Sequence, residues 1–125
     1  MNDSLKSSLE IIEGMILDYF KGLHSADIAL LDSLFDPTAQ LYAPGIRRTK
    51  DEWLTLVANR LVPQELGHPF SYQILSIELL GEQAFAKVSC PLLGHQFIDF
   101  LGFLRENFKW QIVTKQYATN PFLTV

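Results

Sequence analysis

Apolar residues recur every three or four positions over residues 4–23, which is the spacing of one face of a helix. The members of this stripe are Leu5, Leu9, Ile12, Ile16, Tyr19 and Leu23. A second stripe follows Ser25, which we take as its N-cap, and ends at Asp36-Pro37. Its members are Ile28, Leu31, Leu34 and Phe35. Two helices are therefore expected before any strand.

The segment after the second stripe predicts one short strand and a third helix. The run TAQLYAPG, residues 38–45, is extended, because Pro44-Gly45 is turn chemistry and Pro44 disfavours helical geometry at Ala43. Thr49 and Glu52 have the spacing of a capping box, in which each side chain satisfies a backbone donor of the other. We expect a helix to open there and to end by Pro63.

The chain after Pro69 has a different pattern, with long aliphatic and aromatic runs separated by short polar or glycine-containing breaks. The runs are FSYQILSIELLG, QAFAKVSCPLL, HQFIDFLGFLRE and KWQIVTKQYA. They predict four sequential antiparallel strands. The fold class is therefore α+β, in the order α-α-β-α-β-β-β-β, with three helices on one face of a curved sheet and a single domain over residues 1–125.

Both faces of these strands are apolar. In the stretch FIDFLGFL, one alternating set is Phe97, Leu101 and Phe103, and the other is Ile98, Phe100 and Leu104. The helices can cover only one face. We expect the other face to pack against a second copy of the sheet in a homodimer, although loops are an alternative cover.

Charge and composition exclude several classes of protein. The chain is 48% hydrophobic, has a formal net charge of −4, and its basic residues are scattered, which disfavours nucleic-acid and membrane partners. No apolar run approaches the roughly 20 residues of a membrane span, so a cytoplasmic protein is expected. The single cysteine, Cys90, precludes an intramolecular disulfide, and the three histidines are too scattered to predict a metal site. We expect no metal and no cofactor.

The chain resembles the nuclear transport factor two-like superfamily, also called the SnoaL-like cone fold. The resemblance rests on the element order, on the link ending in Ser25-Ala26-Asp27 after the first helix, and on Leu34-Phe35-Asp36-Pro37. The pattern Phe97-x-Asp99-x-Leu101, followed by Trp110-x-Ile112-x-x-Lys115-x-Tyr117, is most similar to the putative lumazine-binding branch. The resemblance implies a cone-shaped α+β domain with one pocket between sheet and helices.

Members of that superfamily include isomerases, dehydratases, cyclases and plain binding domains, so the fold alone does not define a function. Similarity to ketosteroid isomerases implies a tyrosine at Tyr19, a carboxylate base at Ala43 and an acid at Gly102. Two of these three groups are missing from the sequence. Steroid-type proton transfer is therefore rejected.

The site prediction depends on the hairpin near Asn107. A two-residue loop, Asn107-Phe108, would set Lys115 opposite Phe100, whereas a three-residue loop sets Asp99 opposite Tyr117 and Leu101 opposite Lys115. We favour the longer loop, because the shorter one would force Phe108 to a positive φ. Asp99, Lys115 and Tyr117 then share one face of the sheet.

We interpret Asp99, Lys115 and Tyr117 as the polar groups of an apolar ligand pocket and as candidate catalytic residues, with Tyr19, Phe97 and Leu101 supplying contact area. A buried Asp99–Lys115 ion pair that serves only packing is an equal alternative. Trp53 is expected in the core, and Arg47-Arg48 in solvent.

Three functions remain open. The first is a domain that binds a small, apolar or heteroaromatic ligand. The second is an isomerase, dehydratase or cyclase that uses Asp99 as general acid or base, with Lys115 or Tyr117 stabilising an oxyanion. The third is a structural or partner-binding homodimer whose cavity is filled by its own side chains. The absence of a histidine beside Asp99 in the predicted site favours the first.

Overall fold

The computed structural model describes residues 2–119, and the side chains from residue 7 onward. Its helices are α1 (Asn2–Ser25), α2 (Ile28–Leu34) and α3 (Lys50–Asn59). Its strands are β1 (Phe35–Ala43), β2 (Ile46–Thr49), β3 (Gln73–Leu80), β4 (Gln83–Leu92), β5 (His95–Glu106) and β6 (Lys109–Thr119). The α+β class and the four C-terminal strands are confirmed, and the side chain of Leu5 lies outside the described part.

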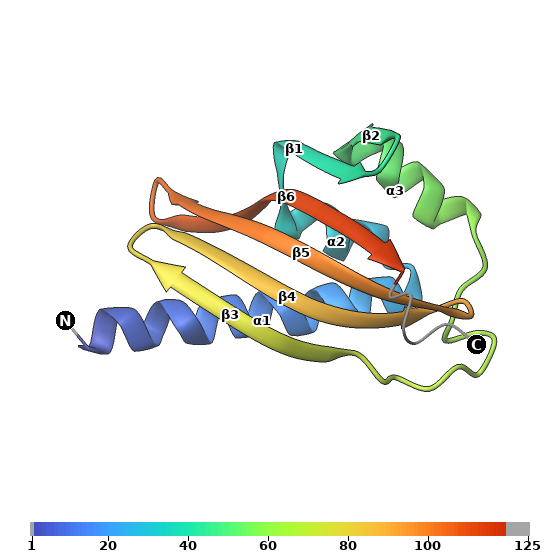
Figure 1. The fold of residues 1–125 in the computed structure, drawn as a ribbon, viewed down its shortest axis with the longest axis horizontal. Helices are drawn as coiled ribbons and strands as arrows, with labels where there is room; N and C mark the ends of the chain where they lie inside the picture. The colour runs from blue at the N-terminus through green and yellow to red at the C-terminus, as the bar shows by residue number, and fades with distance from the viewer. Residues whose placement is uncertain (1, 120–125) are drawn as a thin grey trace.

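The six strands form one sheet in the order β2-β1-β6-β5-β4-β3. Neighbours pair antiparallel, apart from β1 and β6, which are parallel. In Figure 1 the long strands β3–β6 cross the view diagonally, α1 runs along their length behind them, and α3 lies beyond the β1–β2 end. A long connection leads from α3 to β3.

The helix boundaries follow the sequence pattern, with one correction to the capping residue. Ser25 is the last residue of α1, and its hydroxyl donates to the carbonyl of Lys21. Asp27 caps α2 instead, because its carboxylate accepts from the backbone N–H of Leu30 at 3.1 Å. The capping box of Thr49 and Glu52 at α3 is confirmed.

The sequence prediction missed strand β2 and placed the end of the second helix too late. Helix α2 ends at Leu34, and β1 already begins at Phe35 and continues through Asp36 and Pro37. After the turn at Pro44-Gly45 the chain returns as β2, which pairs with β1 over four residues. The order is therefore α-α-β-β-α-β-β-β-β.

The register of β5 and β6 is as predicted, but the hairpin loop is not. The loop contains two residues, and both Asn107 and Phe108 have positive φ, at 52° and 63°. Close to the loop, Phe103 pairs with Ile112, and the next pair is Gly102 with Thr114, so Val113 is an extra residue in β6. This bulge shifts the register by one and sets Asp99 opposite Tyr117 and Leu101 opposite Lys115.

The hydrophobic core lies between the helices and the inner face of the sheet. Tyr19, Phe20, Phe35 and Phe103 are the largest of its fully buried side chains. The outer face remains exposed in the single chain and carries Phe85 and Phe100, whose rings stack with centroids 5.9 Å apart. As predicted, helices cover one face of the sheet, and the other face is apolar and uncovered in the single chain.

Candidate functional site

An inner cavity of about 280 Å³ lies between the sheet and the end of α3. The strands β2, β4, β5 and β6 contribute most of its lining residues, α1 and α3 contribute others, and Arg60 follows α3. The lining residues are Leu23, Ile46, Arg48, Trp53, Leu56, Arg60, Cys90, Leu92, Phe97, Asp99, Lys115 and Tyr117. The cavity is thus mostly apolar with a few polar groups, as small-molecule sites usually are.

Lys115 and Asp99 form the polar base of this cavity. Both side chains are almost fully buried, and Lys115 Nζ lies 3.9 Å from Asp99 Oδ2. The ammonium also lies over the ring of Trp53, at 4.3 Å from the ring centroid, and near the rings of Tyr117 and Tyr19. Trp53, which we expected only in the core, therefore also holds the cation through its π face.

Tyr19 fixes the orientation of Asp99 from behind the cavity wall. Its hydroxyl donates a 2.7 Å hydrogen bond to Asp99 Oδ2, and its side chain has no exposed surface. Burial raises the pKa of Tyr19 well above its ordinary value, and the negative charge of Asp99 raises it further. The phenol therefore remains a hydrogen-bond donor at any physiological pH.

Burial and the neighbouring charges act in opposite directions on the pKa of Lys115. Removal from water lowers this pKa, and the charges of Arg60 and Arg48 lower it further, whereas the carboxylate of Asp99 raises it. The net direction is downward, because desolvation penalises the ammonium most. Burial raises the pKa of the Cys90 thiol, which disfavours the thiolate form that a nucleophile requires.

Tyr117 and Arg48 face each other at the cavity mouth. Arg48 Nη1 donates to Tyr117 Oη at 2.6 Å, which leaves the hydroxyl proton of Tyr117 available for another acceptor. The expectation that Arg47-Arg48 are both solvated is half wrong: Arg47 is exposed, but Arg48 is half-buried. Successive side chains of a strand point to opposite faces, so Arg47 and Arg48 differ in exposure. The sequence prediction missed this difference because it did not identify β2 as a strand.

The inner cavity brings together four of the six predicted site residues. Asp99, Lys115, Tyr117 and Phe97 line it, whereas Tyr19 and Leu101 are fully buried behind them. Sequence reasoning missed Arg60, which follows α3 with no motif that marks it. Histidines are absent from the residues that line the cavity in the described part of the chain.

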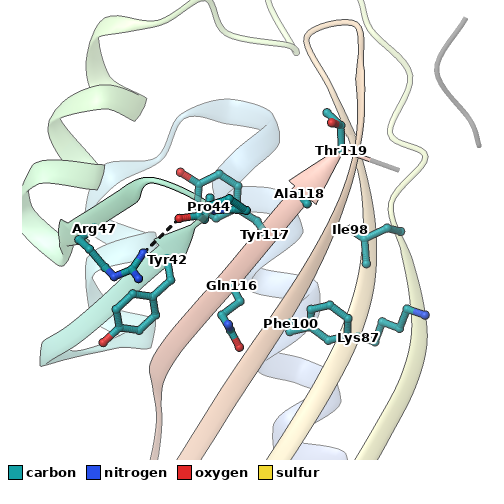
Figure 2. A pocket seen from close by; sticks show the side chains of 11 residues that line it. Tyr42, Pro44, Arg47, Lys87, Ile98, Phe100, Gln116, Tyr117, Ala118 and Thr119 are labelled. Carbon is teal, nitrogen blue, oxygen red and sulfur yellow. Dashed lines mark hydrogen bonds between the residues drawn. The ribbon is translucent and has the colours of Figure 1, made fainter. Parts of the chain in front are cut away.

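A second, wider hollow of about 890 Å³ lies on the outer face of the sheet. Figure 2 shows its side chains, among them Tyr42, Arg47, Lys87, Phe100 and Gln116. Arg47 lies over the ring of Tyr42, and Lys87 lies over the ring of Phe100. The polar groups of this hollow are spread across its surface, whereas those of the inner cavity converge.

The described part of the chain contains neither a candidate membrane-spanning helix nor a candidate metal cluster. Within residues 2–119, none of the helices combines the length and the apolar character that a membrane crossing requires. Among the side chains described from residue 7 to residue 119, no three of His, Cys, Asp or Glu gather closely enough to hold a metal ion.

The fold is that of the nuclear transport factor two-like proteins. An NTF2-like protein of unknown function from Shewanella baltica superposes with a TM-score of 0.80 at 22% identity, over 92% of this chain and 95% of that one. A second such protein, from Silicibacter pomeroyi, gives a TM-score of 0.77 at 19% identity, over 93% and 98%. At these identities the likeness shows the fold alone.

The sequence itself defines the family more narrowly. The family described as "Putative lumazine-binding" matches residues 7–118, and the chain belongs to this family. The predicted superfamily and branch are therefore confirmed. No curated protein matches the sequence.

Proposed function

We propose that this protein is a small-molecule-binding domain whose ligand occupies the inner cavity. The observation that carries the proposal is the cavity itself, because about 280 Å³ remain open around converging polar groups. This volume is near the lower end of the range for small-molecule sites, roughly 300–1,000 Å³. It suits a ligand of one or two rings. An interior filled by its own side chains, the third alternative, would leave no such space.

The proposed roles follow from position. Asp99, Lys115 and Tyr117 orient the polar edge of the ligand, and Phe97 and Trp53 contact its apolar or heteroaromatic body. Tyr19 acts indirectly by holding Asp99, and Leu101 supports the wall from the core. The family description and the aromatic walls both support a heteroaromatic ring as the ligand body.

Binding without catalysis accounts for the polar groups better than acid–base chemistry does. Asp99 already accepts a hydrogen bond from Tyr19 and lies beside the Lys115 ammonium, so contacts within the protein occupy both of these polar groups. A general acid or base works best with a pKa near the working pH, and no histidine is among the described residues that line the cavity. Burial lowers the pKa of Lys115, but this side chain already contacts Asp99 and the ring of Trp53.

Native mass spectrometry of freshly purified protein, followed by a screen against a metabolite library, tests the proposal. Lys115→Met removes the ammonium of the inner cavity, and Lys87→Met removes that of the outer hollow. We expect one small molecule per chain, lost in folded Lys115→Met and retained in Lys87→Met. No bound compound, or loss only in Lys87→Met, would overturn the inner site.

We also propose that the outer face of the sheet pairs two copies of this chain. The exposed stack of Phe85 and Phe100 lies on that face, which none of the described helices covers. Phe100→Glu should convert a dimer to a monomer in sedimentation analysis. Leu61→Glu, which changes an exposed leucine after α3, should not. A wild-type monomer at micromolar concentration would contradict this proposal.

A further inference from the structure

Arg60 carries a guanidinium group whose position is not explained by contacts within the protein. It follows α3 and lines the inner cavity, and its Nη2 atom is buried. Among the described residues, no acceptor lies within hydrogen-bonding distance of this atom. Buried polar groups are nearly always satisfied, and leaving a charged donor without a partner is costly.

The other charges around the cavity do not neutralise Arg60. Three cationic side chains, Arg48, Arg60 and Lys115, line it with a single carboxylate, Asp99, which is engaged by Tyr19 and Lys115. Neither arginine forms an ion pair with the side chains described from residue 7 to residue 119. Arginine remains protonated at neutral pH, so positive charges exceed negative ones here even if Lys115 loses its proton. This excess occurs in a chain with a formal net charge of −4.

The donors at the cavity mouth also match one kind of acceptor. Arg60 offers an unpaired N–H group, and the hydroxyl of Tyr117 has a free proton because it accepts from Arg48. A planar carboxylate has two oxygens that can accept from two such donors at once. Burial lowers the pKa of Arg60, and a bound anion would compensate the charge that burial leaves unpaired.

We infer that the ligand of the inner cavity is an anion, namely a small ring compound that bears a carboxylate. Arg60 and Tyr117 hold the carboxylate, and the ring lies against Trp53 and Phe97. Arg48 supports this arrangement by fixing the hydroxyl of Tyr117. The inference rests on the proposed function and adds the charge and the chemical class of the ligand.

Matched pairs of acids and amides test the inference, because each pair has nearly the same shape and differs in charge. The pairs are benzoate with benzamide, nicotinate with nicotinamide, and pyrrole-2-carboxylate with its amide. Each compound is titrated into ¹⁵N-labelled protein, and the indole N–H resonance of Trp53 reports binding. We expect each acid to bind about tenfold or more tightly than its amide, the effect of one charge-assisted hydrogen bond.

Two variants separate the role of Arg60 from a general effect of charge. Arg60→Met keeps the length of the side chain and removes the guanidinium, and we expect it to abolish the preference for the acids while the affinity for the amides stays within about twofold. Arg47→Met removes an exposed arginine of the outer face and should leave the preference unchanged. Because Nη2 of Arg60 has no partner in the protein, Arg60→Met should also be as stable as the wild type.

The titrations can overturn the anionic ligand without overturning the binding function. Amides that bind as tightly as acids, or an acid preference that survives in Arg60→Met, would overturn the anionic ligand and leave the binding function in place. If neither acids nor amides shift the Trp53 resonance at millimolar concentration, the proposed function fails together with the inference.

Discussion

Tyr19 and Asp99 lie 80 positions apart in the sequence, and a 2.7 Å hydrogen bond joins the hydroxyl of one to the carboxylate of the other. The bond ties the C-terminal part of α1 to the centre of β5, directly behind the inner cavity. It holds Asp99 in place for Lys115, whose Nζ lies 3.9 Å from the same oxygen. The polar base of the cavity therefore depends on packing between the first helix and the sheet.

Removal of this hydroxyl should destabilise the protein and change its response to alkali. Tyr19→Phe leaves Asp99 without its donor, for a loss of about 2 kcal/mol in the free energy of unfolding at pH 7. The raised pKa of Tyr19 means that above its ordinary value of 10.0 the folded state keeps a proton that the unfolded state releases. Wild-type stability should then fall by up to about 1.4 kcal/mol per pH unit because of this group.

Urea denaturation of both proteins between pH 8 and pH 11 measures this difference. The advantage of the wild type over Tyr19→Phe should be constant below pH 10 and should shrink above it. Groups common to both proteins contribute to both curves and largely cancel in the difference. A constant difference up to pH 11 would contradict the assigned shift.

A double-mutant cycle measures the coupling between Asp99 and Lys115. Each group is buried, so Asp99→Asn or Lys115→Met alone leaves a charge with no opposite charge beside it. Each single variant should lower the free energy of unfolding by about 3 kcal/mol. The double variant removes both charges. Its loss should be smaller than the sum of the single losses by roughly 1 kcal/mol. Strictly additive losses would show that the two groups do not interact.

Two glycines of α1 provide a matched test of how closely α2 packs on it. A Cβ at Gly22 would lie 2.6 Å from Cγ and Cδ2 of Leu31, whereas a Cβ at Gly14 meets no atom within 4 Å. We expect Gly22→Ala to lower stability by about 1–3 kcal/mol through overpacking. Gly14→Ala should raise it by roughly 0.5–1 kcal/mol, since alanine favours the helix. Thermal denaturation of both variants measures these changes. A Gly22→Ala variant as stable as the wild type would contradict the close packing of α2 on α1.

The β5–β6 hairpin carries backbone strain at Phe108. Its φ of 63° is unfavourable for a side chain of this size, and the ring is largely exposed. Phe108→Gly should stabilise the protein by about 0.5–1 kcal/mol, part of the gain being offset by the lost contact with Arg105. Phe108→Ala is the control, because it loses the ring and keeps the strain. An alanine variant as stable as the glycine variant would refute the argument.

That hairpin also shows what the sequence could predict and what it could not. Turn preferences favour a three-residue loop, yet the loop Asn107-Phe108 has two residues. The register was nevertheless predicted correctly, because the bulge at Val113 shifts β6 by one residue, as the longer loop would have done. The burial of apolar residues on the inner face favours this register, and that tertiary gain outweighs the strain at Phe108.

The candidate site was predictable only where the residues lie on long strands. Asp99, Lys115 and Tyr117 follow from the alternation of side chains along β5 and β6 and from a register that the burial of apolar residues favours. Arg48 lies on a four-residue strand with weak sequence signals, and Arg60 lies just beyond a helix, where its direction depends on the tertiary packing of α3. The sequence therefore identified the base of the cavity and missed the two arginines.

The most direct test of the inner cavity as the binding site is a ¹H–¹⁵N NMR titration with the compound that native mass spectrometry identifies. Trp53 lines the inner cavity, Gln116 lines the outer hollow, and Trp110 lines neither. We predict that the indole resonance of Trp53 shifts with ligand, while those of Trp110 and the Gln116 amide do not. A shift of the Gln116 amide with Trp53 unchanged would place the ligand on the outer face and contradict this account.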